Sequence, residues 1–231
     1  MKRLILTLFI STLLSWSVTI SAQETTEKTA AAKTELTELT ELTIVEGQHY
    51  TRLDKPIKVT TGEKIEVREL FWYGCPHCNR LEPVIINWLK TKPENTEFVP
   101  TPAVFSQRWV FHAQAYYTIK TLGIDEVAHP MIFDSIHHKR QPINNLKQLS
   151  KFIKANFNID SDKVKKAFES FSVDSNMRAA NAYSLKSGAN GVPTVIVDGK
   201  FRANVQSAGG NQQLFDVVDQ LIVLAESERK S

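Results

Sequence analysis

The only two cysteines of this 231-residue chain, Cys75 and Cys78, are separated by Pro76 and His77. A disulfide between them would close a very short loop, so it would restrict the unfolded chain little and stabilise the fold only weakly. Two thiols at this spacing can instead exchange a disulfide with another molecule, one as the nucleophile and the other as the resolving thiol. The pair therefore indicates redox chemistry.

The residues around Cys75 favour a thiolate, which is the nucleophilic form of cysteine. Cys75 is predicted to lie at a helix N-terminus, where unpaired amides and the helix dipole favour negative charge. Pro76 suits the first turn of a helix, and His77 can carry positive charge or donate a hydrogen bond toward the sulfur. Stabilising this thiolate stabilises the reduced pair, so the disulfide is predicted to be oxidising. Cys78, one turn further, is placed to attack a mixed disulfide at Cys75.

Other uses of a cysteine pair fit the sequence less well. A structural zinc site needs about four ligands, and the chain has no second cysteine pair. A c-type haem requires histidine directly after the second cysteine, where Asn79 stands. We therefore predict no metal and no cofactor. His112 and His129 lack tight ligand spacing, and the pair His137-His138 is interpreted as a solvated polar patch.

The segments flanking the cysteines predict the elements that position them. Residues 64–73, KIEVRELFWY, alternate and then become continuously apolar, which predicts a strand entering a buried position in a sheet. An apolar stripe at helical spacing follows the cysteines directly: Leu81, Val84, Ile85, Trp88 and Leu89. Residues 96–105 are predicted to form a second strand, at an edge or with an irregular course because of their prolines. Cys75 is thus expected where an inner strand ends and a helix begins.

The middle of the chain is predicted to be helical and its end to return to a sheet. Helical stripes cover residues 113–120, 127–136 and 144–157, and a further one joins Val164, Ala167, Phe168 and Phe171. Asp198-Gly199 between two apolar segments predicts a hairpin, and residues 211–229 predict a final helix. This order fits an α/β thioredoxin fold at residues 44–105 and 176–231, with an all-helical domain inserted at residues 106–175.

The N-terminus carries the pattern of a secretory signal peptide. Lys2 and Arg3 precede an apolar run, and small residues lead to Ala22, after which we predict cleavage. Residues 23–43, rich in repeated Thr-Glu-Leu, are interpreted as a flexible leader. The net charge of +3 for the whole chain implies no strong attraction to nucleic acid.

The cysteine motif and a second motif far along the chain together resemble a known family. CPHC after an apolar strand, with GVPT at residues 191–194, is similar to the DsbA group of periplasmic thiol:disulfide oxidoreductases within the thioredoxin superfamily. The resemblance covers residue 45 to the C-terminus. It implies that Cys75 is the nucleophile and Cys78 the resolving thiol. Val192-Pro193 matches the family's cis-proline loop, which is implied to face the disulfide and to hold substrate backbone.

The resemblance also covers an acidic residue before the motif. Glu69 matches the family's buried acid under the active site, which is implied to accept a proton from Cys78. The family often pairs this acid with a basic residue in the following strand, and the alignment places Pro100 there. Glu69 can therefore act as a proton relay only if that role does not require a basic partner.

The function that the resemblance implies is oxidation of newly translocated proteins in the periplasm. The partners would be folding secreted proteins with free thiols and a quinone-linked membrane oxidase of the DsbB type that restores the disulfide. The protein is expected to act as a monomer. Two alternatives stay open: a disulfide isomerase or reductase of the same fold, and a peptide-binding chaperone whose cysteines are incidental.

Overall fold

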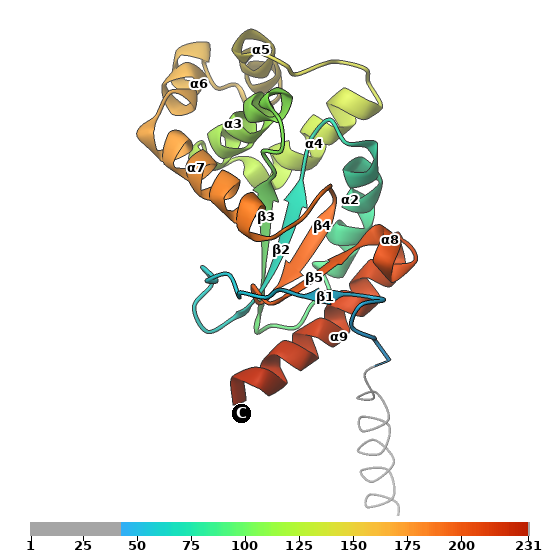
Figure 1. The fold of residues 1–231 in the computed structure, drawn as a ribbon. Helices are drawn as coiled ribbons and strands as arrows, with labels where there is room; N and C mark the ends of the chain where they lie inside the picture. Colours follow the sequence, from blue (N-terminus) through green and yellow to red (C-terminus); the bar gives the residue numbers. More distant parts are fainter. Residues whose placement is uncertain (1–42, 231) are drawn as a thin grey trace, which may run out of the picture. The chain divides into compact units, whose positions relative to one another are not determined.

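A computed structural model describes residues 43–230, so the predicted signal peptide and all but the last residue of the predicted leader lie outside the described residues. Residues 43–230 form a five-stranded mixed sheet in the order β1-β5-β4-β2-β3 (Figure 1). Its strands are β1 (Thr51–Arg52), β2 (Ile65–Phe71), β3 (Thr96–Pro102), β4 (Thr194–Val197) and β5 (Phe201–Asn204). None of the helices in these residues is long and apolar enough to cross a membrane.

Strand β2 occupies an inner position, as its continuous apolar pattern predicts. It pairs in parallel with β3 and antiparallel with β4, and all seven of its residues are buried. Strand β3 comes last in the order of strands, which confirms the edge position predicted from its prolines. The carboxyl end of β2 therefore points from the middle of the sheet toward Cys75.

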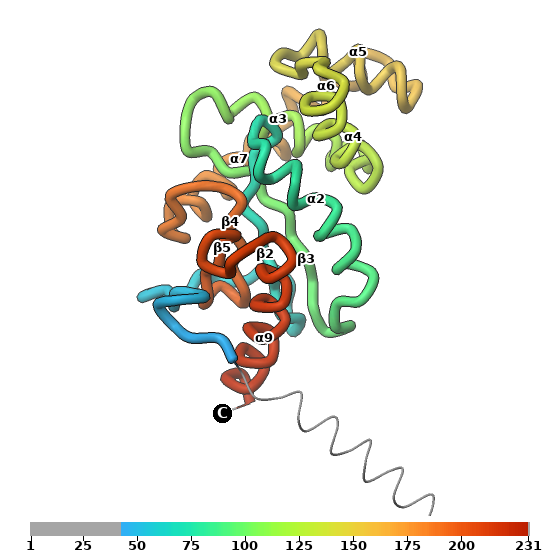
Figure 2. Tube along the Cα trace, turned by 90° about the vertical axis from the view of Figure 1, so that its right-hand side faces the viewer, coloured from blue at the N-terminus to red at the C-terminus, as the bar shows by residue number. Residues whose placement is uncertain are grey.

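Two helices cover one face of the sheet, α2 (Pro76–Trp88) and α9 (Asn211–Lys230). Their apolar stripes, which include Leu81, Ile85 and Leu221, pack against Val67 and Val195 of the inner strands. Figure 2 shows α9 and α2 lying beside the strands from a second direction. This layer fixes the direction of α2, and with it the position of the cysteines at the start of that helix.

The helical block between β3 and β4 contains α3 (Gln107–Thr121), α4 (Asp125–His137), α5 (Leu146–Phe157), α6 (Ser161–Phe168) and α7 (Phe171–Lys186). Figure 1 shows it beyond the carboxyl end of β2. Asn145 is the N-cap of α5, because its side chain accepts a hydrogen bond from the Gln148 amide at 3.0 Å. The fold class predicted from the sequence, a thioredoxin fold with a helical insertion, is the one observed.

The end of the insertion differs from the prediction. Phe171 does not continue the stripe of α6: it begins α7 and its side chain is 79% exposed. The domain boundary predicted after residue 175 falls inside α7. Val173 and Ala180 of this helix pack in the helical block, whereas Tyr183 packs with Leu70 and Ile196 of the sheet. Helix α7 therefore belongs to both cores.

The predicted Asp198-Gly199 turn joins β4 to β5. Both residues have positive φ, 52° and 64°, as a tight type I′ hairpin turn requires. A side chain at Gly199 would place its Cβ 1.9 Å from the backbone oxygen of Ile57. The Asp198 carboxylate pairs with Arg229 near the end of α9. The turn thus holds the last helix against the sheet.

A buried ion pair lies on the other face of β2. Arg68 donates a hydrogen bond to Glu66 at 2.7 Å, and its remaining donors reach the hydroxyls of Thr101 and Thr60 at 2.7 and 2.8 Å. Its guanidinium carbon lies 4.4 Å from the centre of the Tyr183 ring. Because both charges are buried, each depends on the other for compensation.

Candidate active site

Cys75 lies where strand β2 gives way to helix α2, as predicted. It is the N-cap residue of α2, with extended backbone angles, and Pro76 occupies the first helical position. Cys78 lies one turn inside the helix and is fully buried, whereas Cys75 retains 7% exposure. Both thiols are free in this structure. Only the outer sulfur is available to another molecule.

The two thiols have opposite acidities. The pKa of Cys75 falls to about 5, chiefly because the Cys78 thiol donates a hydrogen bond to its sulfur. Burial works against this shift, and the backbone amides of Cys78 and His77 at the helix N-terminus support it. The pKa of Cys78 is raised well above its usual value, first by burial and then by that same hydrogen bond. Cys75 is therefore a thiolate at neutral pH, and Cys78 is a thiol.

His77 contributes less than the sequence suggests. Its side chain is exposed, and its ring nitrogen Nδ1 accepts a hydrogen bond from the Arg80 guanidinium at 2.8 Å. Since a guanidinium can only donate, Nδ1 of His77 is an acceptor here. It is therefore not available for the predicted hydrogen bond to the Cys75 sulfur. The hydrogen bond from Arg80 to Nδ1 disfavours a positive charge on His77, and such a charge is the last of the influences that lower the Cys75 pKa, after the His77 backbone amide. The main stabilisation of the thiolate comes from Cys78 and the helix N-terminus.

We expect His77→Ser to make the pair less oxidising, but only slightly. The backbone amide at residue 77 persists in the variant, so only the side-chain charge is lost. The reduction potential should fall by about 30 mV or less, since 30 mV corresponds to roughly 1.4 kcal/mol for this couple. Redox equilibration with glutathione measures the change, and Asn79→Ser, one position past the motif, is the control. A higher potential in His77→Ser would contradict this account.

The cis-proline loop predicted from the family resemblance lies beside the cysteines. The Val192-Pro193 peptide bond is cis, and the carbonyl oxygen of Val192 lies 3.5 Å from the sulfur of Cys75. Val192 packs in the same apolar cluster as Trp109, whose ring stacks on that of Trp72 with the centroids 4.7 Å apart. The carbonyl group of Val192 thus borders the outer sulfur.

Glu69 lies in the sheet below the cysteines and is fully buried. Among residues 43–230, neither of its carboxylate oxygens has a hydrogen-bond partner. Burial raises its pKa well above the usual range, and the charges of Glu82 and Cys75 raise it further. Pro100 is its partner in the register of β2 and β3, as the alignment places it. A buried carboxyl group with a raised pKa can exchange a proton with Cys78, whose pKa its charge raises.

Several side chains lie near the site although nothing in the cysteine motif predicts them. Tyr73 is buried, its hydroxyl lies 2.8 Å from Nδ1 of His129, and its carbonyl oxygen lies 2.7 Å from Nε2 of His137. The prediction that His137 and His138 form a solvated polar patch is therefore wrong for His137. His138 is exposed. Helix α4 brings these histidines to the active site from more than 50 residues away in sequence. In the described part of the chain, no cluster of His, Cys, Asp and Glu could hold a metal.

Two thiols of opposite acidity at the start of a helix, on a thioredoxin fold, define the class of thiol:disulfide oxidoreductases. Comparison with known proteins narrows the class. A family model described as DSBA-like thioredoxin domain matches residues 110–221. The chain is 38% identical over 185 residues to the thiol:disulfide interchange protein DsbA of Azotobacter vinelandii, covering 80% of this chain and 85% of that protein. The chain belongs to the DsbA family.

Other relatives and solved structures agree with this assignment. The DsbA of Pseudomonas aeruginosa strain PAO1 is 35% identical over 183 residues, covering 79% of this chain and 85% of that protein. A crystal structure of Pseudomonas aeruginosa DsbA matches with a TM-score of 0.77 and 32% identity, covering 81% of this chain and 97% of that one. The DsbA structure from Xylella fastidiosa matches with a TM-score of 0.74 and 29% identity, covering 83% of this chain and all of that one.

Proposed function

We propose that this protein is a periplasmic oxidase that donates the Cys75-Cys78 disulfide to newly translocated proteins. The observation that carries the proposal is the contrast between the two thiols: Cys75 has a pKa of about 5, whereas that of Cys78 is raised. A stabilised thiolate favours the reduced pair over the disulfide, and a disulfide that is easily reduced oxidises other thiols. The predicted signal peptide supports the periplasmic location.

The reaction follows from the exposure of the two sulfurs. A substrate thiolate attacks Cys75, forms a mixed disulfide with it and expels the Cys78 thiolate, which takes up a proton because its pKa is raised. A second substrate thiol, deprotonated, attacks the substrate sulfur of that mixed disulfide. The substrate leaves with a new disulfide, and Cys75 leaves as a stable thiolate. Two electrons pass from the substrate to the cysteine pair.

The neighbouring groups have supporting roles in this proposal. The backbone of Val192, next to the Cys75 sulfur, pairs with an extended segment of the substrate, and Pro193 orients that backbone. Glu69 exchanges a proton with Cys78, since it is buried and unpaired among the described residues. A quinone-linked membrane oxidase of the DsbB type restores the disulfide, and the protein acts as a monomer without a cofactor.

The test combines alkylation with an oxidation assay. Alkylation of the reduced protein from pH 4 to pH 9 should show Cys75 reacting with a midpoint of about 5, whereas Cys78 stays protected. The oxidised protein should form disulfides in a reduced, unfolded substrate, and Cys75→Ser should abolish this activity. If Cys78 reacts first in acid, the roles are reversed. Activity only on scrambled disulfides would favour an isomerase, and substrate protection by the doubly substituted Cys75→Ser, Cys78→Ser protein would favour a chaperone.

A further inference from the structure

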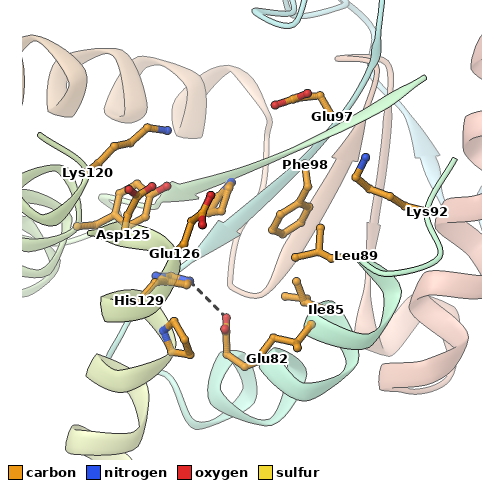
Figure 3. A pocket seen from close by; sticks show the side chains of 14 residues that line it. Glu82, Ile85, Leu89, Lys92, Glu97, Phe98, Lys120, Asp125, Glu126 and His129 are labelled. Carbon is orange, nitrogen blue, oxygen red and sulfur yellow. Dashed lines mark ion pairs between the residues drawn. The ribbon is translucent and has the colours of Figure 1, made fainter. Parts of the chain in front are cut away.

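A cavity of about 410 Å³ lies between helix α2, strand β3 and helices α3 and α4. Figure 3 shows Glu82 on α2 and His129 on α4 facing each other across it. The other charged or titratable groups that line it are Lys92, Glu97, Tyr116, Lys120, Asp125 and Glu126. The space is large enough for several water molecules, each of which occupies about 30 Å³ in the liquid.

The Glu82–His129 pair joins the cavity to buried structure. Nε2 of His129 lies 3.5 Å from Oε1 of Glu82, and their side chains are only 12% and 9% exposed. The other ring nitrogen of His129 lies 2.8 Å from the Tyr73 hydroxyl. In the described residues, Oε1 of Glu82 has no hydrogen-bond partner. A carboxyl and an imidazole this close can pass a proton from one to the other through a direct hydrogen bond or through one water molecule.

The cavity also reaches the strand position beside Glu69. Pro100, the register partner of Glu69, is one of its lining residues. Glu69 lies on the same face of β2 as Val67, because side chains two residues apart share a face. That face is the one covered by α2, the helix that carries Glu82. Proline places no basic side chain at this position, and the charge of Glu82, which lines the cavity, raises the pKa of Glu69.

We propose that this cavity carries protons between solvent and the buried Glu69–Cys78 pair, with Glu82 and His129 as positioning residues that relay them. The inference rests on the proposed function and deepens it. When substrate attacks Cys75, Cys78 leaves as a thiolate and takes one proton from Glu69. Solvent returns that proton to Glu69 through His129 and Glu82. When Cys78 later resolves a mixed disulfide during reoxidation, its proton leaves by the same route in the opposite direction.

The test follows the second step of oxidation by glutathione disulfide. The Cys75 thiolate of the reduced protein attacks one sulfur of glutathione disulfide, forms a mixed disulfide and releases one glutathione. Cys78 then loses its proton, attacks Cys75 and releases the second glutathione. Acid quenching and intact mass spectrometry report how much mixed disulfide is present at each time. The variants are Glu82→Gln and His129→Gln, and Glu97→Gln at the same cavity is the control.

In both relay variants we expect the first step to keep its rate and the mixed disulfide to accumulate. Resolution should slow by about tenfold or more, since positioned acid–base groups contribute about 10²–10⁴-fold to proton transfer. Glu82→Asp, which keeps a carboxyl group, should recover much of the rate. In His129→Ala, added imidazole should accelerate resolution, which a merely structural role of the histidine would not explain. Glu97→Gln should match the wild type.

The outcomes separate this inference from the proposed function. If Cys75 reacts and resolution is unchanged in Glu82→Gln and His129→Gln, the proton route is wrong and the oxidase remains. Slower resolution that neither imidazole nor Glu82→Asp rescues would also overturn the route, because it would indicate loss of structure. If Cys75 does not react with glutathione disulfide at all, the proposed function itself fails.

Discussion

The reduced protein should be more stable than the oxidised protein at pH 7, by about 2 kcal/mol. The thiolate of Cys75 has a pKa of about 5 in the folded state, against 9.0 for an unperturbed thiol. At pH 7, two pH units above the folded pKa, each unit contributes about 1.4 kcal/mol, and screening by nearby solvent reduces the sum. The disulfide adds little in return, because its loop is so short.

The sign of the pH dependence distinguishes this cause from any other. A depressed folded pKa adds stability that is complete above the unfolded pKa near 9 and is lost as pH falls through about 5. Denaturant melts of the two redox forms should therefore differ at pH 7 and converge at pH 3. Cys75→Ser, which has no thiolate at this position, should lose the part of the pH dependence that distinguishes the reduced form from the oxidised form. An oxidised form that is the more stable at pH 7 would contradict the oxidase proposal.

Arg68→Met should cost about 3–5 kcal/mol of unfolding free energy, the usual result of breaking a buried ion pair on one side. The change leaves the Glu66 carboxylate, which is fully buried, without its guanidinium partner. It also removes the hydrogen bonds to Thr60 and Thr101. Urea denaturation of the reduced variant at pH 7 measures the loss.

Two further variants test the cause of that loss. Arg68→Met combined with Glu66→Gln should be more stable than Arg68→Met alone, since no uncompensated charge remains buried. Lys64→Met breaks the pair with Glu97, whose side chains are 50% and 48% exposed, and should change stability by about 1 kcal/mol or less. Equal losses in Lys64→Met and Arg68→Met would show that burial does not decide the effect.

The sequence predicts those parts of the site that depend on neighbouring residues. Strand β2, the start of α2 and the location of Cys75 between them follow from an apolar run, a helical stripe and a proline in the first turn. The Asp198-Gly199 hairpin is equally local, because positive φ at both residues is a property of the turn itself. In each case the pattern and the structure that it specifies lie within about a dozen residues of each other.

The parts of the site that the sequence does not predict are long-range or geometric. Glu82 and His129 meet because α2 and α4 pack together, and no spacing in the chain records that contact. The role of His77 depends on a rotamer, since Arg80 occupies its ring nitrogen.

Helix α7 limits how the molecule can adapt to what it binds. Because this 16-residue helix packs into both apolar cores, rocking the helical block against the sheet would require the helix to bend. Hinges usually lie in loops or at the ends of elements, where large changes in φ and ψ are absorbed. The loop that carries Val192 follows α7 within six residues and is held by the same packing. If the proposed function is right, most of the conformational adjustment on binding at Cys75 falls to the substrate protein.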